Sequence, residues 1–119
     1  MTKSLTLSLL GVIFLVTFKP TFAESFGYNL NVNTDIISIL DDPIDDQNVK
    51  LTGYLIKKVS SDKYLFKSGD VQIRVEIDNH VFPKQPFDED TLITIIGEVE
   101  KDFLQSPEID VDVIEIAEP

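Results

Sequence analysis

Near the C-terminus, the stretch PEIDVDVIEI places a carboxylate at nearly every second position of a β-branched run. Successive side chains of an extended strand point to opposite faces, so Asp110 and Asp112 share one face. The other face carries three apolar residues, Ile109, Val111 and Val113. A row of carboxylates attracts cations, and it is also the ordinary solvent-facing side of a half-buried strand. The sequence therefore allows a ligand-binding surface or a solubilising one.

The residue types that catalysis needs are scarce. His80 is the only histidine, so a metal site built on several imidazoles is excluded. A lone histidine close to Asp78 is more typical of a solvated turn than of a general base. None of the serines lies in a nucleophile-elbow pattern. We therefore expect no catalytic residue, no enzyme activity and no cofactor; a hydrolase that depends on His80 is the alternative.

Two acidic segments raise the question of calcium, which prefers several carboxylate and carbonyl oxygens. They are DDPIDD at residues 41–46 and Asp88-Glu89-Asp90. Neither has the alternating acidic spacing and central glycine of an EF-hand loop. We interpret both as solvated acidic loops and predict no metal site.

The hydrophobic pattern predicts the elements that must position these residues. A short helix is expected over Asp35–Leu40, with Thr34 as N-cap and Pro43 preventing its continuation. The period then changes to two, which is typical of strands. The five predicted strands are Val49–Val59, Lys63–Ser68, Val71–Asp78, Leu92–Glu100 and the PEIDVDVIEI stretch. Gly53 marks a bend in the first strand, and residues 79–90 form a loop with at most one helical turn.

Five short strands need a topology that leaves few open edges. The pattern predicts an all-β fold: a small five-stranded Greek-key OB-fold barrel preceded by the short N-terminal helix. In this barrel the fifth strand lies beside the third and the fourth, and the fourth closes onto the first. Ile109, Val111 and Val113 would then fill the interior. Asp110 and Asp112 would face water near Arg74.

OB-folds commonly bind ligands on the face of their second and third strands. The outward residues expected there are mixed in sign, which suits a zwitterionic or polar ligand better than a polyanion. Together with the strongly acidic charge of the chain, this predicts a small cationic or polar ligand. The predicted ligand-binding residues, on strands two, three and five, are Lys67, Gln72, Arg74, Glu76, Asp78, Asp110 and Asp112.

The first residues are typical of a signal peptide. Lys3 gives a positive start, Leu5–Phe18 is an apolar run of the expected length, and small residues precede a cleavage point between Ala23 and Glu24. The run is shorter than the roughly 20 apolar residues that span a membrane. We predict export to the periplasm and no stable membrane anchor after cleavage; a retained anchor is the alternative.

The predicted organisation is a signal peptide at 1–23, a flexible segment at 24–33 and an OB-fold domain at 34–119. Loss of Lys3 and Lys19 with the signal peptide leaves 8 basic and 21 acidic residues, a net charge of −13 over 96 residues. Because nucleic-acid affinity comes from Lys and Arg on the phosphates, no nucleic-acid partner is expected. The chain has no cysteine, so no disulfide supports the exported domain.

The run VKLTGYLIKKVSSDKYLFKSGDVQIRVEID, Val49–Asp78, and GEVEKDF followed by PEIDVDVIEI resemble the bacterial OB-fold (BOF) family of periplasmic stress-tolerance proteins, the YgiW/YdeI-like group. The resemblance covers about residues 34–117. It implies a periplasmic protein linked to stress response, with small or cationic ligands or envelope proteins as partners. Residues 79–83 depart from it, because many relatives have a tryptophan-containing segment there. A module that docks on another envelope protein, without a small ligand, is the alternative function.

Overall fold

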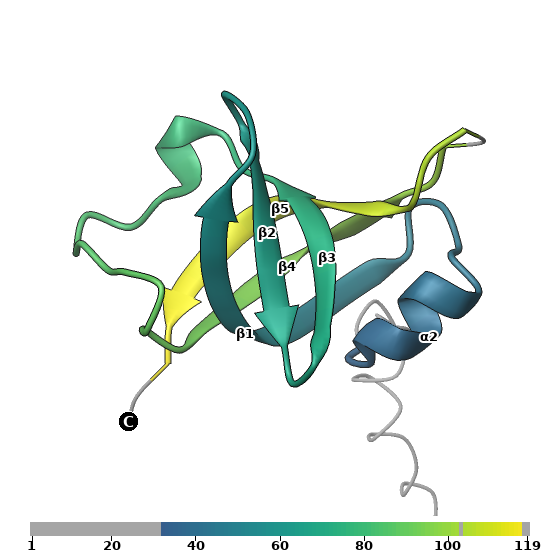
Figure 1. Cartoon of the computed structure of the whole chain (residues 1–119), viewed down its shortest axis with the longest axis horizontal. Helices are drawn as coiled ribbons and strands as arrows, with labels where there is room; N and C mark the ends of the chain where they lie inside the picture. Colours follow the sequence, from purple (N-terminus) through teal and green to yellow (C-terminus); the bar gives the residue numbers. More distant parts are fainter. Residues whose placement is uncertain (1–31, 103, 118–119) are drawn as a thin grey trace, which may run out of the picture. The chain divides into compact units, whose positions relative to one another are not determined.

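The computed structural model describes residues 32–102 and 104–117, which form a five-stranded barrel with one short α-helix (Figure 1). The predicted signal peptide, its cleavage point and most of the predicted flexible segment lie outside the described residues. Among the described residues, no helix has both the length and the hydropathy that a membrane crossing requires.

The strands lie within two residues of their predicted bounds. They are β1 (Asn48–Lys58), β2 (Lys63–Ser68), β3 (Val71–Glu76), β4 (Ile93–Glu100) and β5 (Glu108–Ile116). The predicted loop between β3 and β4 contains a single 3-10 turn, η2 (Asn79–Val81). In β1 the burial alternates residue by residue along most of the strand, because every second side chain points into the barrel.

The sheet closes on itself in the order β1-β2-β3-β5-β4. β3 and β5 are parallel, and all other neighbours are antiparallel. The predicted Greek-key order is therefore confirmed: β5 lies between β3 and β4, and β4 closes onto β1. In the closed barrel each strand has a neighbour on both sides, so none is an edge strand.

The helix α2 (Ile36–Asp41) packs Ile36 and Ile39 into the core. Its N-cap is Asp35, whose Oδ1 accepts a hydrogen bond from the backbone N–H of Ile37 at 3.1 Å. The prediction of Thr34 as N-cap was wrong by one residue. Both residue types cap well, and Asn33 decides between them because its Oδ1 accepts from the Asp35 N–H at 2.8 Å.

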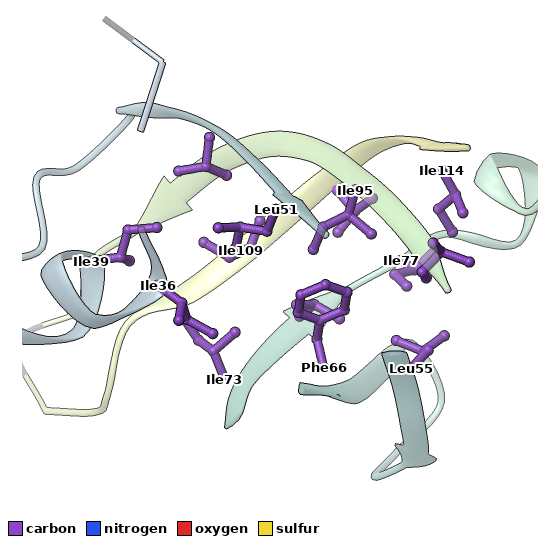
Figure 2. Close-up of a cluster of buried hydrophobic side chains, with 14 of the residues drawn as sticks. Ile36, Ile39, Leu51, Leu55, Phe66, Ile73, Ile77, Ile95, Ile109 and Ile114 are labelled. Atoms are coloured by element: carbon purple, nitrogen blue, oxygen red, sulfur yellow. The ribbon is translucent and has the colours of Figure 1, made fainter. Parts of the chain in front are cut away.

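The core is a single cluster of aliphatic side chains around Phe66 (Figure 2). Phe66, Ile95 and Ile109 are completely buried. Gly53 marks a close approach of β1 to β2, because a Cβ atom there would overlap the backbone carbonyl of Lys67. The glycine at this position thus has a steric reason: only glycine lets the two backbones come so near.

A β-bulge in β5 overturns one core prediction. Ile96 pairs with Val113 and Gly97 with Val111, so Asp112 is an extra residue without a partner. A bulge shifts the alternation by one position. As a result Val113 is 41% exposed and Ile114 only 7%. Ile109 and Val111 fill the interior as predicted, but the prediction for Val113 was wrong.

Candidate functional site

The outer surface of β3, β5 and β4 carries a concentration of carboxylates, which we call the acidic face. Its members are Glu76, Glu98, Glu100, Glu108, Asp110 and Asp112. The strand register lines them up: Asp110 lies between Glu76 of β3 and Glu98 of β4, and Glu108 lies opposite Glu100. Like charges directly opposite each other destabilise a sheet. This arrangement therefore favours the uptake of protons or other cations.

Protons are already held more tightly on this face than on ordinary carboxylates. A hydrogen bond with Asp112, together with burial and neighbouring charges, raises the pKa of Glu98 to about 7. Burial, and then the charges of Asp112 and Asp78, raise the pKa of Asp110. Burial is also the main reason why the pKa of Glu100 is raised. Each shift lowers the cost of crowding negative charge on three adjacent strands.

One corner of the acidic face has its own counter-ions. Glu108 is 9% exposed and accepts from Lys63 Nζ at 2.5 Å and from Arg74 Nη1 at 3.4 Å. Lys63 Nζ also lies 3.5 Å from Glu76 Oε1. The hydrogen bond to Glu108 is the main reason why the pKa of Lys63 is raised. In the described part of the chain, the ion pairs reach neither Glu98 nor Asp110.

Two groups of carboxylates bring oxygen atoms close enough to touch one metal ion. One consists of Asp62, Glu76 and Asp78, and the other of Glu76, Glu100 and Glu108; within each group the oxygens lie within 4.8 Å of one another. Calcium–oxygen distances are about 2.3–2.6 Å, so ligands of one ion are at most about 5 Å apart. Lys63 contacts two members of the second group, Glu76 and Glu108, but only Glu76 of the first. The group that contains Asp78 is therefore the less occupied by a counter-ion.

The structure divides the predicted ligand-binding residues into two sets. Glu76, Asp110 and Asp112 belong to the acidic face; Arg74 contacts it through Glu108, and the Asp78 charge acts on Asp110. Lys67 and Gln72 pair with each other at the other end of the β2–β3 ladder. They lie about 13 Å from Glu76, at about 3.3 Å per residue, and so do not join the other five.

The expected position of Asp110 and Asp112 near Arg74 needs a correction. The parallel register places Glu108 opposite Arg74, whereas Asp110 is opposite Glu76. Alternation along a strand tells which face a residue occupies, but it does not tell which residue of the next strand is its neighbour.

Five residues of the site were outside the predicted set: Asp62, Lys63, Glu98, Glu100 and Glu108. Three of them had a signal in the sequence. Glu108 alternates in phase with Asp110, and Glu98 and Glu100 occupy the outward positions of β4. Asp62 lies in the β1–β2 turn, and only the folded structure brings its carboxylate close to that of Asp78.

The other sequence candidates lie elsewhere. His80 is exposed in η2. In each acidic loop a carboxylate accepts a hydrogen bond from a backbone N–H. Asp45 Oδ1 accepts from the Lys101 N–H at 2.9 Å, and Asp88 Oδ1 accepts from the Asp90 N–H at 2.9 Å.

A closed five-stranded barrel of this strand order, with a polar outer face, defines an OB-fold. Comparison with known families makes the class specific. The chain belongs to the bacterial OB fold (BOF) protein family, whose model matches residues 18–116. The family resemblance of the sequence is thereby confirmed.

Two bacterial proteins are similar along much of their length. The calcium-regulated OB-fold protein CarO of Pseudomonas aeruginosa is 30% identical over 110 residues, which cover 92% of this chain and 94% of CarO. The solved structure of the hypothetical protein YgiW from E. coli is 30% identical, with a TM-score of 0.65, over 71% of this chain and 90% of YgiW.

A more distant structure extends the fold likeness. The telomere capping protein Ten1 from Schizosaccharomyces pombe matches with a TM-score of 0.55 over 73% of this chain and 80% of Ten1. At 18% identity it shows the shared OB-fold alone.

Proposed function

We propose that this protein is an exported, non-catalytic binding protein of the cell envelope that takes up a small cationic ligand, with calcium as the first candidate, through its acidic face and the neighbouring carboxylates of Asp62 and Asp78. The observation that supports this most directly is the alignment of carboxylates from β3, β5 and β4 in one patch. The pKa values of Glu98, Glu100 and Asp110 are all raised there, first by a hydrogen bond or by burial and then by the neighbouring negative charges.

Calcium is the first candidate because its ligands are hard oxygen atoms. Asp62, Glu76 and Asp78 offer three such oxygens within 4.8 Å of one another. The P. aeruginosa relative is calcium-regulated by name. Three carboxylates completed by water are typical of weak sites, so we expect a dissociation constant of about 10⁻⁴–10⁻³ M. A site of that strength in the periplasm would respond to external calcium and link the protein to envelope stress.

The alternative is a module that docks on another envelope protein. Closure of the barrel argues against docking by strand addition, since each strand already has two neighbours. A protein partner would have to recognise side chains, and the acidic face would again be the charged surface available to it.

Thermal unfolding of the purified protein tests the proposal. Calcium chloride, magnesium chloride and spermidine are added separately at low and moderate salt. At ten times its dissociation constant a ligand stabilises the folded state by about 1.4 kcal/mol, which for a domain of this size raises Tm by about 5–10 °C. If none of these cations raises Tm, the proposal fails.

Charge-matched variants separate a site from general screening. Asp62→Asn/Asp78→Asn removes two carboxylates of the group that contains Asp78, and Asp41→Asn/Asp42→Asn removes two exposed ones at the C-terminal end of α2. We expect the first variant to lose the calcium-induced rise in Tm and the second to keep it. An equal loss in both, or crosslinking of intact cells to one dominant protein in the Asp62/Asp78 variant and wild type alike, would contradict cation uptake as the function.

A further inference from the structure

A recess of about 600 Å³ lies between the end of the β1–β2 hairpin and the loop that joins β3 to β4. We call it the basic aromatic groove. Its lining includes three aromatic residues, Tyr64, Phe82 and Phe87, and three lysines, Lys57, Lys58 and Lys84. It shares no residue with the acidic face. In Figure 1 the β3–β4 loop and the β4–β5 loop lie at opposite ends of the barrel.

A bulge in β1 places one of these lysines over an aromatic ring. The β1–β2 pairing runs from Leu55 opposite Phe66 to Lys57 opposite Leu65, so Ile56 is an extra residue. Beyond it, Lys58 lies opposite Tyr64, and directly opposed side chains share a face. Lys58 Nζ lies 5.7 Å from the centre of the Tyr64 ring. The bulge thus joins a cation to the aromatic lining.

The rings form one connected cluster. Tyr64 and Phe82 meet edge to face with centres 5.5 Å apart, and Phe82 stacks on Phe87 at 6.1 Å. All three side chains are partly buried against the core and partly open to the groove. Each therefore offers a ligand an apolar surface that is already ordered by packing.

The charge of the groove is opposite to that of the chain. Within residues 32–102 and 104–117, Lys57, Lys58 and Lys84 form no ion pair. Two acids also line the groove, Asp88 and Glu89. The Asp88 carboxylate accepts hydrogen bonds from the Asp90 N–H and the Thr91 hydroxyl, which hold it in place. The lining therefore carries three positive and two negative charges, a small positive excess in a strongly acidic chain.

We propose that the basic aromatic groove binds a small amphipathic anion, in which a carboxylate, sulfonate or phosphate is joined to a flat apolar body. The rings contact the flat body, and the lysines contact the anionic group. The volume falls within the range of about 300–1,000 Å³ typical of small-molecule sites. A purely apolar ligand would leave the lysines unused, and a cation would be repelled by them.

Fluorescence titration with two probes tests this site. The anion 8-anilinonaphthalene-1-sulfonate and its neutral analogue N-phenyl-1-naphthylamine have similar ring systems but differ in charge. At neutral pH we expect the native protein to bind the sulfonate at one saturable site. Lys58→Gln/Lys84→Gln should weaken sulfonate binding about tenfold, on the scale of two lost ionic contacts, and leave the neutral probe nearly unchanged. Phe87→Ala should weaken both probes.

Matched variants make the result decisive. Lys50→Gln/Lys101→Gln removes the same charge from two exposed lysines outside the groove and should leave sulfonate binding within about twofold of wild type. Asp62→Asn/Asp78→Asn should bind the sulfonate normally, which separates this site from the carboxylates proposed to bind calcium. The proposal is overturned if the native protein does not bind the sulfonate, or if both lysine variants lose the same affinity while urea unfolding shows them to be equally stable.

Discussion

The carboxyl group of Glu98 on β4 shares a hydrogen bond with that of Asp112 on β5, the extra residue of the β5 bulge. Two carboxyl groups can share a hydrogen bond only when one of them is protonated. The pKa of Glu98 accordingly rises to about 7, to which burial and the charges of Asp110 and Asp46 also contribute. The acidic face therefore takes up a proton at Glu98 as pH falls through about 7.

This pair predicts that stability falls as pH rises from about 4.5 to 7. In that window the folded protein still holds the Glu98 proton, whereas the unfolded chain, with its ordinary pKa of 4.5, has lost it. Because Glu98 is partly exposed, solvent screening reduces the effect to about 1 kcal/mol. Urea unfolding at pH 5 and pH 8 should show that Glu98→Gln loses about 1 kcal/mol less than wild type. The control is Glu115→Gln, an exposed glutamate of β5; equal pH dependence in all three proteins would rule out the shared proton.

Glu108 predicts a measurable coupling with Lys63, because the two form a short ion pair in which Glu108 is 9% exposed. Glu108→Gln should destabilise the protein by about 1–2 kcal/mol, between the values for exposed and buried pairs. A double-mutant cycle with Lys63→Met should give a coupling of about 1 kcal/mol from urea unfolding. Strictly additive losses would mean that the contact contributes nothing.

The bulge in β5 predicts that the same substitution costs very different amounts of stability at two positions. Val111 is 3% exposed and Val113 is 41% exposed. Val111→Ala should cost about 2 kcal/mol, since it removes buried methyl groups and leaves a cavity. Val113→Ala should cost less than about 0.5 kcal/mol, as for other surface changes. Similar losses in chemical denaturation would show that β5 keeps a simple alternation through Val113.

Two glycines are predicted to differ in how they tolerate alanine. A Cβ at Gly97 would overlap the backbone carbonyl of Asp110, whereas a Cβ at Gly69 would meet no atom within 4 Å. Gly97→Ala should therefore cost about 3 kcal/mol through overpacking. Gly69 has a φ of 62°, so its alanine variant should lose only about 1–2 kcal/mol of backbone strain. Midpoints of urea unfolding rank the two variants, and the reverse order would place the close β4–β5 approach elsewhere.

The sequence by itself determined the strands, most of their buried faces and the scarcity of residue types that catalysis needs. These features are local: a strand must alternate if one side is to be buried. Ile73 and Val75 in β3, and Ile93 and Ile95 in β4, lie in the core at the positions that this alternation predicts.

Only the tertiary structure decided which side chains meet. Register set Glu108 against Arg74, and the bulge turned Val113 outward and brought Ile114 in. The basic aromatic groove unites Lys58 with Phe82 and Phe87 from a separate loop. The reason is that side-chain period constrains one strand at a time, whereas neighbours across strands depend on how the whole barrel closes.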